Sequence, residues 1–191
     1  MVKMTLNVKH LSDEELYAYL SQDKHKAIAA FNEIYERYSS KIYTYCHKVL
    51  DNNEVADDIF QDTFTKFFEG AVNNAESTNL AAYLIKIARN LCLNEKSKKH
   101  NQNIPLDDFQ LPVYDKSYEN KEINELLETA LDALPENYKE ALIMKEFMDL
   151  SYKEIAEALH VSLSVVRTRI YRGKTRLREI MAPYIKDLTG N

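Results

Sequence analysis

The stretch from Leu150 to Arg178 carries the strongest local signals in the chain and constrains its fold most. Two helix-start signals overlap at its beginning, a capping box and a hydrophobic staple. They are formed by the pairs Ser151 with Glu154 and Leu150 with Ile155. A break at His160 is followed by Ser162, which can cap a second helix. The stretch therefore predicts two helices joined by a short turn.

The second of these helices sorts its residues by face. At about 100° per residue, one narrow stripe collects Val166, Ile170, Gly173 and Leu177. The opposite side collects Ser164, Arg167, Thr168, Tyr171, Arg172 and Thr175. Residues 161–178 hold six cations, Lys174 and Arg176 among them, and no acid. Because arginine can pair with guanine and both cations neutralise phosphates, we interpret this as a helix-turn-helix DNA reader. An ordinary amphipathic helix with a solvated basic face is the alternative.

Periodicity extends this helical reading to the whole chain. The 191 residues include only three glycines and four prolines, and most of the chain shows a 3.6-residue period, so we predict an all-α protein. The expected helices span residues 12–20, 27–50, 54–72, 79–98, 121–134 and 135–148, followed by the helix-turn-helix. We expect two small helical domains, residues 1–100 and a four-helix unit at 120–191, joined by an acidic linker at 101–119.

The distribution of charge qualifies the DNA-binding hypothesis. The net charge is −5, which does not favour DNA, but its sign varies along the chain. Residues 51–70 carry six acids against one lysine, whereas residues 86–99 carry five cations against one acid. We therefore expect DNA contacts at two basic patches and a different partner for the acidic one.

The acidic segment predicts a docking face for a protein. Asp58, Gln61, Asp62 and Thr65 recur at helical spacing, opposite a broad apolar side. A merely solvated face is one alternative, and a metal or acid–base site that includes Asp57 is another. No His or Cys stands nearby, and the chain has no glycine-rich phosphate loop. We therefore expect no catalytic residue, no metal site and no cofactor.

The basic segment predicts a contact with a nucleic-acid backbone. Lys86, Arg89 and Lys96 are expected to share the face opposite an apolar stripe of Leu80, Leu84, Ile87 and Leu91. Tyr83 can stack on a base or pack against the preceding phenylalanine-rich helix, and the sequence leaves both open. Elsewhere the sequence contains neither a signal-peptide pattern nor a membrane-spanning run, and Cys46 and Cys92 are expected to be buried thiols in a reducing cytoplasm.

Four segments in order resemble one family. They are AFNEIYERYSSKIY (30–43), DDIFQDTFTKFF (57–68), AAYLIKIARNLCLN (81–94) and the stretch from LPENYKE to KTRLRE (134–179). Together they resemble a bacterial RNA polymerase sigma factor of the extracytoplasmic-function (ECF) group, over residues 13–182. The resemblance implies a non-enzymatic cytoplasmic factor that binds core RNA polymerase and promoter DNA, and it implies an anti-sigma factor as a further partner.

The resemblance also implies roles for individual residues. The polymerase-binding helix would use Asp58, Gln61, Asp62 and Thr65. Recognition and melting of the −10 element would involve Asn73, Asn74, Tyr83, Lys86, Arg89, Asn90 and Lys96, with a base captured by the loop 73–79. Reading of the −35 element would involve Ser164, Arg167, Thr168, Tyr171, Arg172, Lys174 and Arg176.

Several positions depart from the family pattern. Lys96, Lys98 and Lys99 replace a typical arginine cluster, which keeps the charge but loses the bidentate geometry. Tyr83 stands where tryptophan is common, and His160 stands at a turn position usually given to glycine, where a left-handed backbone would be strained. Gly173 replaces the usual alanine, which is expected to weaken the helix by about 1 kcal/mol. A second hypothesis is a stand-alone helix-turn-helix regulator that dimerises through its N-terminal helices.

Overall fold

The computed structural model describes residues 6–73, 79–101 and 119–189 and confirms the all-α prediction, since these residues form helices and no strand. The N-terminal helices are α1 (Asp13–Leu20), α2 (Lys24–Val49), α3 (Asn53–Asn73) and α4 (Leu80–Asn101). The C-terminal elements are α5 (Glu119–Asp132), α6 (Glu136–Leu142), the π-helix η1 (Ile143–Phe147), α7 (Tyr152–Leu159) and α8 (Leu163–Thr189). Within the described ranges, no helix has the length and apolarity that a membrane crossing requires.

Helix starts follow the predicted capping chemistry. Both capping boxes form, Ser12 with Glu15 at α1 and Ser151 with Glu154 at α7. At the start of α4, the Asn79 side chain accepts a hydrogen bond from the N–H of Ala82 at 3.1 Å. Helix ends were predicted less well. The segment 70–79 was expected to be a loop, but α3 continues through Gly70 to Asn73, and η1 was not expected at all.

The N-terminal bundle is held by an aromatic seam between α2 and α3. Phe31 and Tyr35 of α2 contact Phe64 of α3, with ring centroids 6.3 and 4.8 Å apart. Tilted and edge-on rings at these separations add to the free energy gained from apolar burial. Helix α2 also buries Ile34 and Tyr45, neither of which has any exposed surface. Tyr35 is the exception, because it stays 41% exposed at the rim of the seam.

Two buried thiols lie in the N-terminal core, as predicted. Cys46 on α2 and Cys92 on α4 are both fully buried. A hydrogen bond with Cys46 and burial raise the pKa of the Cys92 thiol well above its usual range. A protonated, buried thiol is a poor nucleophile and a poor metal ligand, so the pair is structural.

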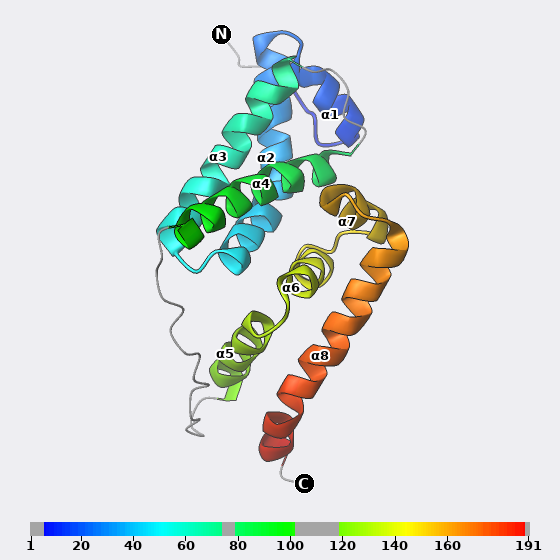
Figure 1. Cartoon of the computed structure of the whole chain (residues 1–191). Helices are drawn as coiled ribbons and strands as arrows, with labels where there is room; N and C mark the ends of the chain where they lie inside the picture. The colour runs from blue at the N-terminus through cyan, green and yellow to red at the C-terminus, as the bar shows by residue number, and fades with distance from the viewer. Residues whose placement is uncertain (1–5, 74–78, 102–118, 190–191) are drawn as a thin grey trace.

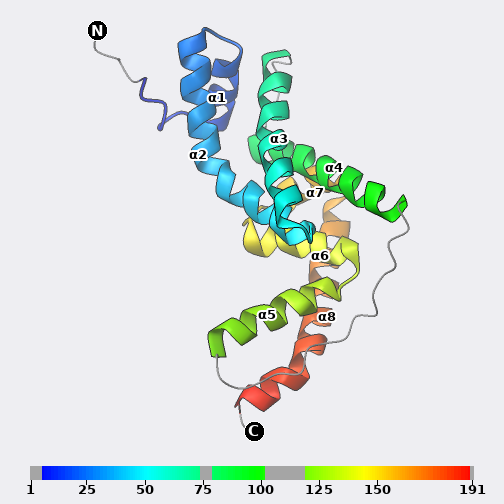
Figure 2. The same cartoon turned by 90° about the vertical axis from the view of Figure 1, so that its left-hand side faces the viewer.

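The two halves of the chain pack against each other through α4. Figures 1 and 2 show α4 next to α6 and α7 of the C-terminal unit, and the C-terminal end of α2 contacts η1 as well. The C-terminal unit consists of α5, α6 with η1, α7 and α8, in agreement with the predicted four-helix unit. The long helix α8 runs along α6, where Val166 and Ile170 are buried.

Gly173 allows α8 to approach α6 closely. A Cβ atom at this position would lie 2.8 Å from Cδ1 and 3.1 Å from Cγ of Leu142, a side chain that is itself buried. The sequence-based expectation that this glycine only weakens the helix was therefore incomplete. Its cost in helix propensity is offset by close packing that an alanine would disturb.

We expect Gly173→Ala to lower the free energy of unfolding by about 1 kcal/mol, because crowding against Leu142 costs more than the gain in helix propensity. Thr168→Ala on the exposed side of α8 is the matched control, and it should raise the free energy of unfolding by about a few tenths of a kcal/mol. Urea denaturation of the full chain measures both. A stabilisation of about 1 kcal/mol by Gly173→Ala would contradict the close approach.

His160 ends α7 in the left-handed backbone conformation, which is the one expected at a turn position usually given to glycine. Its φ and ψ are 52° and 44°, and its N–H donates to the Glu157 carbonyl at 3.2 Å. A side chain with a Cβ is strained there, whereas glycine is not.

Replacing His160 by glycine is expected to raise the free energy of unfolding by about 0.5–1 kcal/mol, since the strain is relieved. His25→Gly, the same replacement within the right-handed helix α2, should lower it instead. Thermal unfolding monitored by circular dichroism distinguishes the two. Equal effects of the same sign would show that backbone strain at His160 is not the cause.

Candidate functional site

The exposed side of α3 carries the predicted polymerase-binding residues. Asp58, Gln61, Asp62 and Thr65 are all exposed and recur at helical spacing, so they form one strip along the helix. The opposite side of α3 is buried, with Thr63 and Phe67 fully covered. The sequence therefore placed both sides of this helix correctly, and the strip is free to meet another protein.

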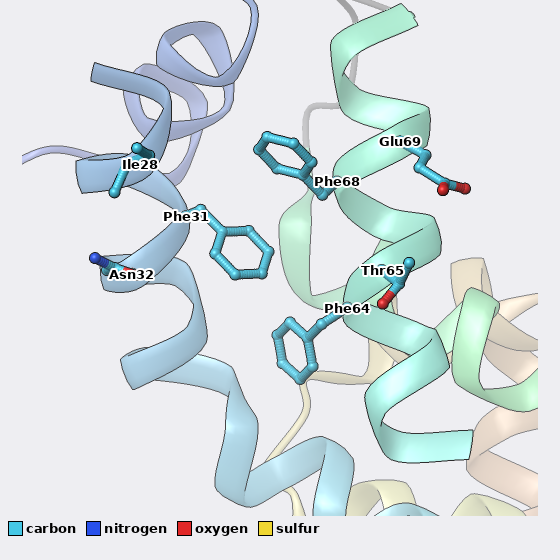
Figure 3. A pocket seen from close by; sticks show the side chains of 7 residues that line it. All are labelled: Ile28, Phe31, Asn32, Phe64, Thr65, Phe68 and Glu69. Atoms are coloured by element: carbon cyan, nitrogen blue, oxygen red, sulfur yellow. The ribbon is translucent and has the colours of Figure 1, made fainter. Parts of the chain in front are cut away.

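An apolar groove runs beside this strip, between α2 and α3 (Figure 3). It has a volume of about 500 Å³. Its floor is aromatic, made by Phe31, Phe64 and Phe68, while Thr65 lies on its α3 side. On the α2 side stands Ile28, which is 48% exposed. The sequence carries a signal for this groove, since Ile28 and Phe31 are three residues apart on one face of the helix.

Helix α4 carries the residues predicted to follow an opened DNA strand. In the structure some of them are exposed and others pair with the C-terminal half. Lys86 and Asn90 are exposed. Arg89 and Lys96 instead turn toward the C-terminal half, where both pair with glutamates of α6. The backbone of Asn73 ends α3, and Asn74 lies outside the described residues. The expected apolar stripe is also shifted, because Ile85, Ala88 and Cys92 are buried more completely than Ile87 and Leu91.

Glu140 of α6 is the buried centre of the contact between the halves. Its carboxylate accepts hydrogen bonds from Arg89 Nε at 2.7 Å, from Arg89 Nη2 at 3.3 Å and from the Tyr45 hydroxyl at 2.8 Å. Partial burial acts to lower the pKa of the Arg89 guanidinium. The hydrogen bond and negative charge of Glu140 outweigh this effect, so the pKa of Arg89 is raised. The pKa of the Tyr45 hydroxyl is raised, chiefly by burial and further by the negative charge of Glu140. Arg89 therefore stays charged and Tyr45 stays protonated.

Tyr83 packs against the aromatic residues of the N-terminal bundle, which is one of the two roles that the sequence leaves open. Its ring is 5.9 Å from Phe67 and 6.4 Å from Tyr17, and it is only partly exposed. A Cβ added at Gly70 would lie 2.6 Å from the Tyr83 hydroxyl oxygen. The ring therefore lies within the aromatic core of the N-terminal bundle, so stacking on a base would require it to leave these contacts.

Helix α8 displays the predicted DNA-reading residues on one exposed face. Ser164, Arg167, Thr168 and Arg172 are exposed, and Tyr171 is the most exposed of the large hydrophobic side chains, at 73%. Two cations farther along the helix are already paired, Lys174 with Glu146 at 2.8 Å and Arg176 with Glu179 at 3.1 Å. The arrangement is that of a helix-turn-helix whose second helix faces solvent with arginine, threonine and tyrosine.

Three residues of the contact between the halves were missed from the sequence, namely Tyr45, Glu136 and Glu140. Tyr45 has the helical spacing of an ordinary core aromatic, and the two glutamates resemble ordinary surface acids of a short helix. Their partners lie 95, 40 and 51 residues away in sequence, so no local pattern reports them. Among the described residues, no group of three or more histidine, cysteine, aspartate or glutamate residues is arranged to hold a metal ion.

Two family models match the chain. Residues 34–102 match Sigma-70 region 2, and residues 124–177 match Sigma-70, region 4. The first range spans most of α2 with α3 and α4, and the second spans the C-terminal unit through the first half of α8. The two matches together cover more than half of the chain.

Among curated relatives, the chain is similar to the ECF RNA polymerase sigma factor SigE of Mycolicibacterium smegmatis, with 28% identity over 84% of this chain. The match spans 65% of that relative's length. It is also similar to the ECF RNA polymerase sigma factor SigM of Bacillus subtilis, with 25% identity over 82% of this chain and 98% of that protein.

Solved structures share the fold. CnrH, solved in complex with the cytosolic domain of CnrY, has a TM-score of 0.69 at 18% identity and covers 90% of this chain and 97% of its own. The sigma factor RpoE of Bartonella quintana, solved with the anti-sigma factor NepR, has a TM-score of 0.66 at 18% identity and covers 80% and 96%.

Proposed function

Because the chain belongs to the ECF sigma factors of bacterial RNA polymerase, we propose that it binds core polymerase and directs it to promoters, with no catalytic step of its own. The matches to both conserved regions, in order, are the observation that supports this function most. The stand-alone dimeric regulator is not favoured, because the N-terminal half matches sigma region 2 rather than serving as an unrelated dimerisation unit. The work would take place in the cytoplasm, where the polymerase acts.

The polymerase would bind the strip of Asp58, Gln61, Asp62 and Thr65 on α3. Support comes from the exposure of all four side chains and from the apolar groove beside Thr65. A partner surface that combines basic residues with one apolar side chain would match this strip and the groove together. Such a combination gives charge steering and an apolar anchor in the same interface.

Asp58→Arg combined with Asp62→Arg is expected to weaken capture of core polymerase by at least about tenfold, since two attractive charges become repulsive. A pull-down with purified core polymerase measures it. Glu14→Arg with Glu36→Arg is the matched control, because it makes the same change in net charge at exposed sites on α1 and α2. Capture by the α3 variant at the wild-type level, or an equal loss in the control, would count against this docking face.

Promoter DNA would be held at two places. The face of α8 with Arg167, Thr168, Tyr171 and Arg172 would enter the major groove of the −35 element. Lys86, Arg89, Asn90 and Lys96 of α4, with the loop after Asn73, would follow the opened strand at the −10 element. We assign residues 1–100 and 120–191 to these two tasks, with 101–119 as the linker. The exposed arginines of α8 support the first assignment directly.

Arg172→Ala is expected to cost about 1–3 kcal/mol on the preferred −35 sequence and to relax the preference at one base pair. Lys174→Ala should weaken all sequences alike and by less, because Lys174 must first leave Glu146 to reach a phosphate. Transcription by the reconstituted holoenzyme on a set of single-base promoter variants measures both. An equal loss of transcription on every promoter variant for Arg172→Ala would show that Arg172 does not read a base.

An anti-sigma factor would be a further partner of this chain. Support comes from the fold shared with a sigma factor that was solved together with the anti-sigma factor NepR. A protein that covers the strip on α3 or the face of α8 would block one of the two proposed partners. Competition between such a protein and core polymerase is the expected behaviour.

A further inference from the structure

Val165 is an exposed apolar side chain on the first turn of α8, at the end of a recognition helix that contacts base edges. Its exposed fraction is 38%, and that of the nearby apolar residue Leu163 is 36%. The buried stripe of α8 runs through Val166 and Ile170. At about 100° per residue, Leu163 lies about 40° from the centre of this stripe, whereas Val165 lies about 120° from it. Leu163 therefore borders the core, and Val165 belongs to the side that faces solvent.

Val165 lies in one row with two residues of the proposed reading face. Thr168 and Arg172 follow it at i+3 and i+7, so the three side chains lie one after another along the same side of α8. All three are exposed. The Thr168 hydroxyl donates to the Ser164 carbonyl at 2.9 Å, which uses its single proton. Of these three side chains, Arg172 is therefore the one that still offers hydrogen-bond donors to a base.

The chemistry of this row matches a particular pattern of base edges. In the major groove, thymine presents a methyl group, whereas guanine presents two acceptors that fit a guanidinium. A valine placed against the polar edge of guanine, adenine or cytosine would bury donors or acceptors without a partner, which costs free energy. A phosphate offers a valine side chain no favourable contact either. The first turn of α8 is therefore suited to a thymine, with a guanine farther along the helix.

We propose that Val165 is a specificity-determining residue that contacts the C5-methyl group of a thymine in the −35 element. The inference deepens the proposed role of α8 in reading this element and rests on it. The seven residues from Val165 to Arg172 correspond to about 10 Å along the helix axis. Successive base pairs are about 3.4 Å apart, so the thymine lies within about three base pairs of the position that Arg172 reads.

The test removes single methyl groups from the DNA. A duplex that the reconstituted holoenzyme prefers is first selected from a library with a randomised −35 region. Each thymine of that region, in either strand, is then replaced by deoxyuridine, which keeps the base pairing and lacks the C5-methyl group. Competition for the holoenzyme measures the affinity of each duplex. The wild-type chain should lose about fourfold in affinity at one thymine, as expected when one methyl group is no longer buried.

Val165→Ala should reduce this loss to less than about twofold at the same thymine, because the side chain that contacts the methyl group is gone. The variant keeps its fold, since Val165 is exposed and alanine favours a helix. Leu163→Ala, which shortens the other exposed apolar side chain of the same turn, is the matched control and should keep the fourfold loss. Comparing the two duplexes within each variant cancels any general weakening of DNA binding.

Three results would overturn the inference and leave the proposed function intact. They are no loss at any thymine, a loss that persists in Val165→Ala, and a loss that disappears equally in Leu163→Ala. A sensitive thymine more than about three base pairs from the position relaxed by Arg172→Ala would overturn it as well. A holoenzyme that transcribes without any preference within the −35 region would overturn the reading of this element by α8, and the inference with it.

Discussion

The buried carboxylate of Glu140 is the constraint on which the arrangement of this protein depends. A charge that is 6% exposed must be compensated, and Arg89 and Tyr45 supply three hydrogen bonds from two different helices of the other half. Removing one member of such a buried pair typically costs about 3–5 kcal/mol, because the other charge is left without a partner. Glu140 therefore helps to fix the orientation of α6 on α4, together with the apolar core that the two halves share.

The three proposed surfaces differ in accessibility in the same molecule. The acidic strip of α3 points to solvent, as does the arginine-bearing face of α8, whereas Arg89 and Lys96 of α4 pair with glutamates of α6. A net charge of −5 is compatible with DNA binding under these conditions, because the acids and bases occupy separate surfaces and some of them neutralise each other within the chain.

Local patterns in the sequence predicted most of the helices and the exposed faces of α3 and α8. Capping boxes at Ser12 and Ser151 act over three residues, and the stripes of α3 and α8 over a few turns, so they are readable without the fold. The environment of Arg89 was not readable, since its partner is 51 residues away. The close approach at Gly173 depends in the same way on Leu142 of another helix, and helix propensity alone gave it the wrong meaning. Sequence patterns fail here where the environment of a residue is determined by another residue far away in the chain.

The central claim is that the acidic strip of α3 binds core polymerase while other surfaces of the chain hold promoter DNA. A photo-crosslinking residue at position 61, within that strip, tests it most directly. In the holoenzyme we predict crosslinks from position 61 to core polymerase, and few from the same residue placed at position 14 on α1. An active holoenzyme in which position 61 gives no crosslink to core polymerase would contradict the account.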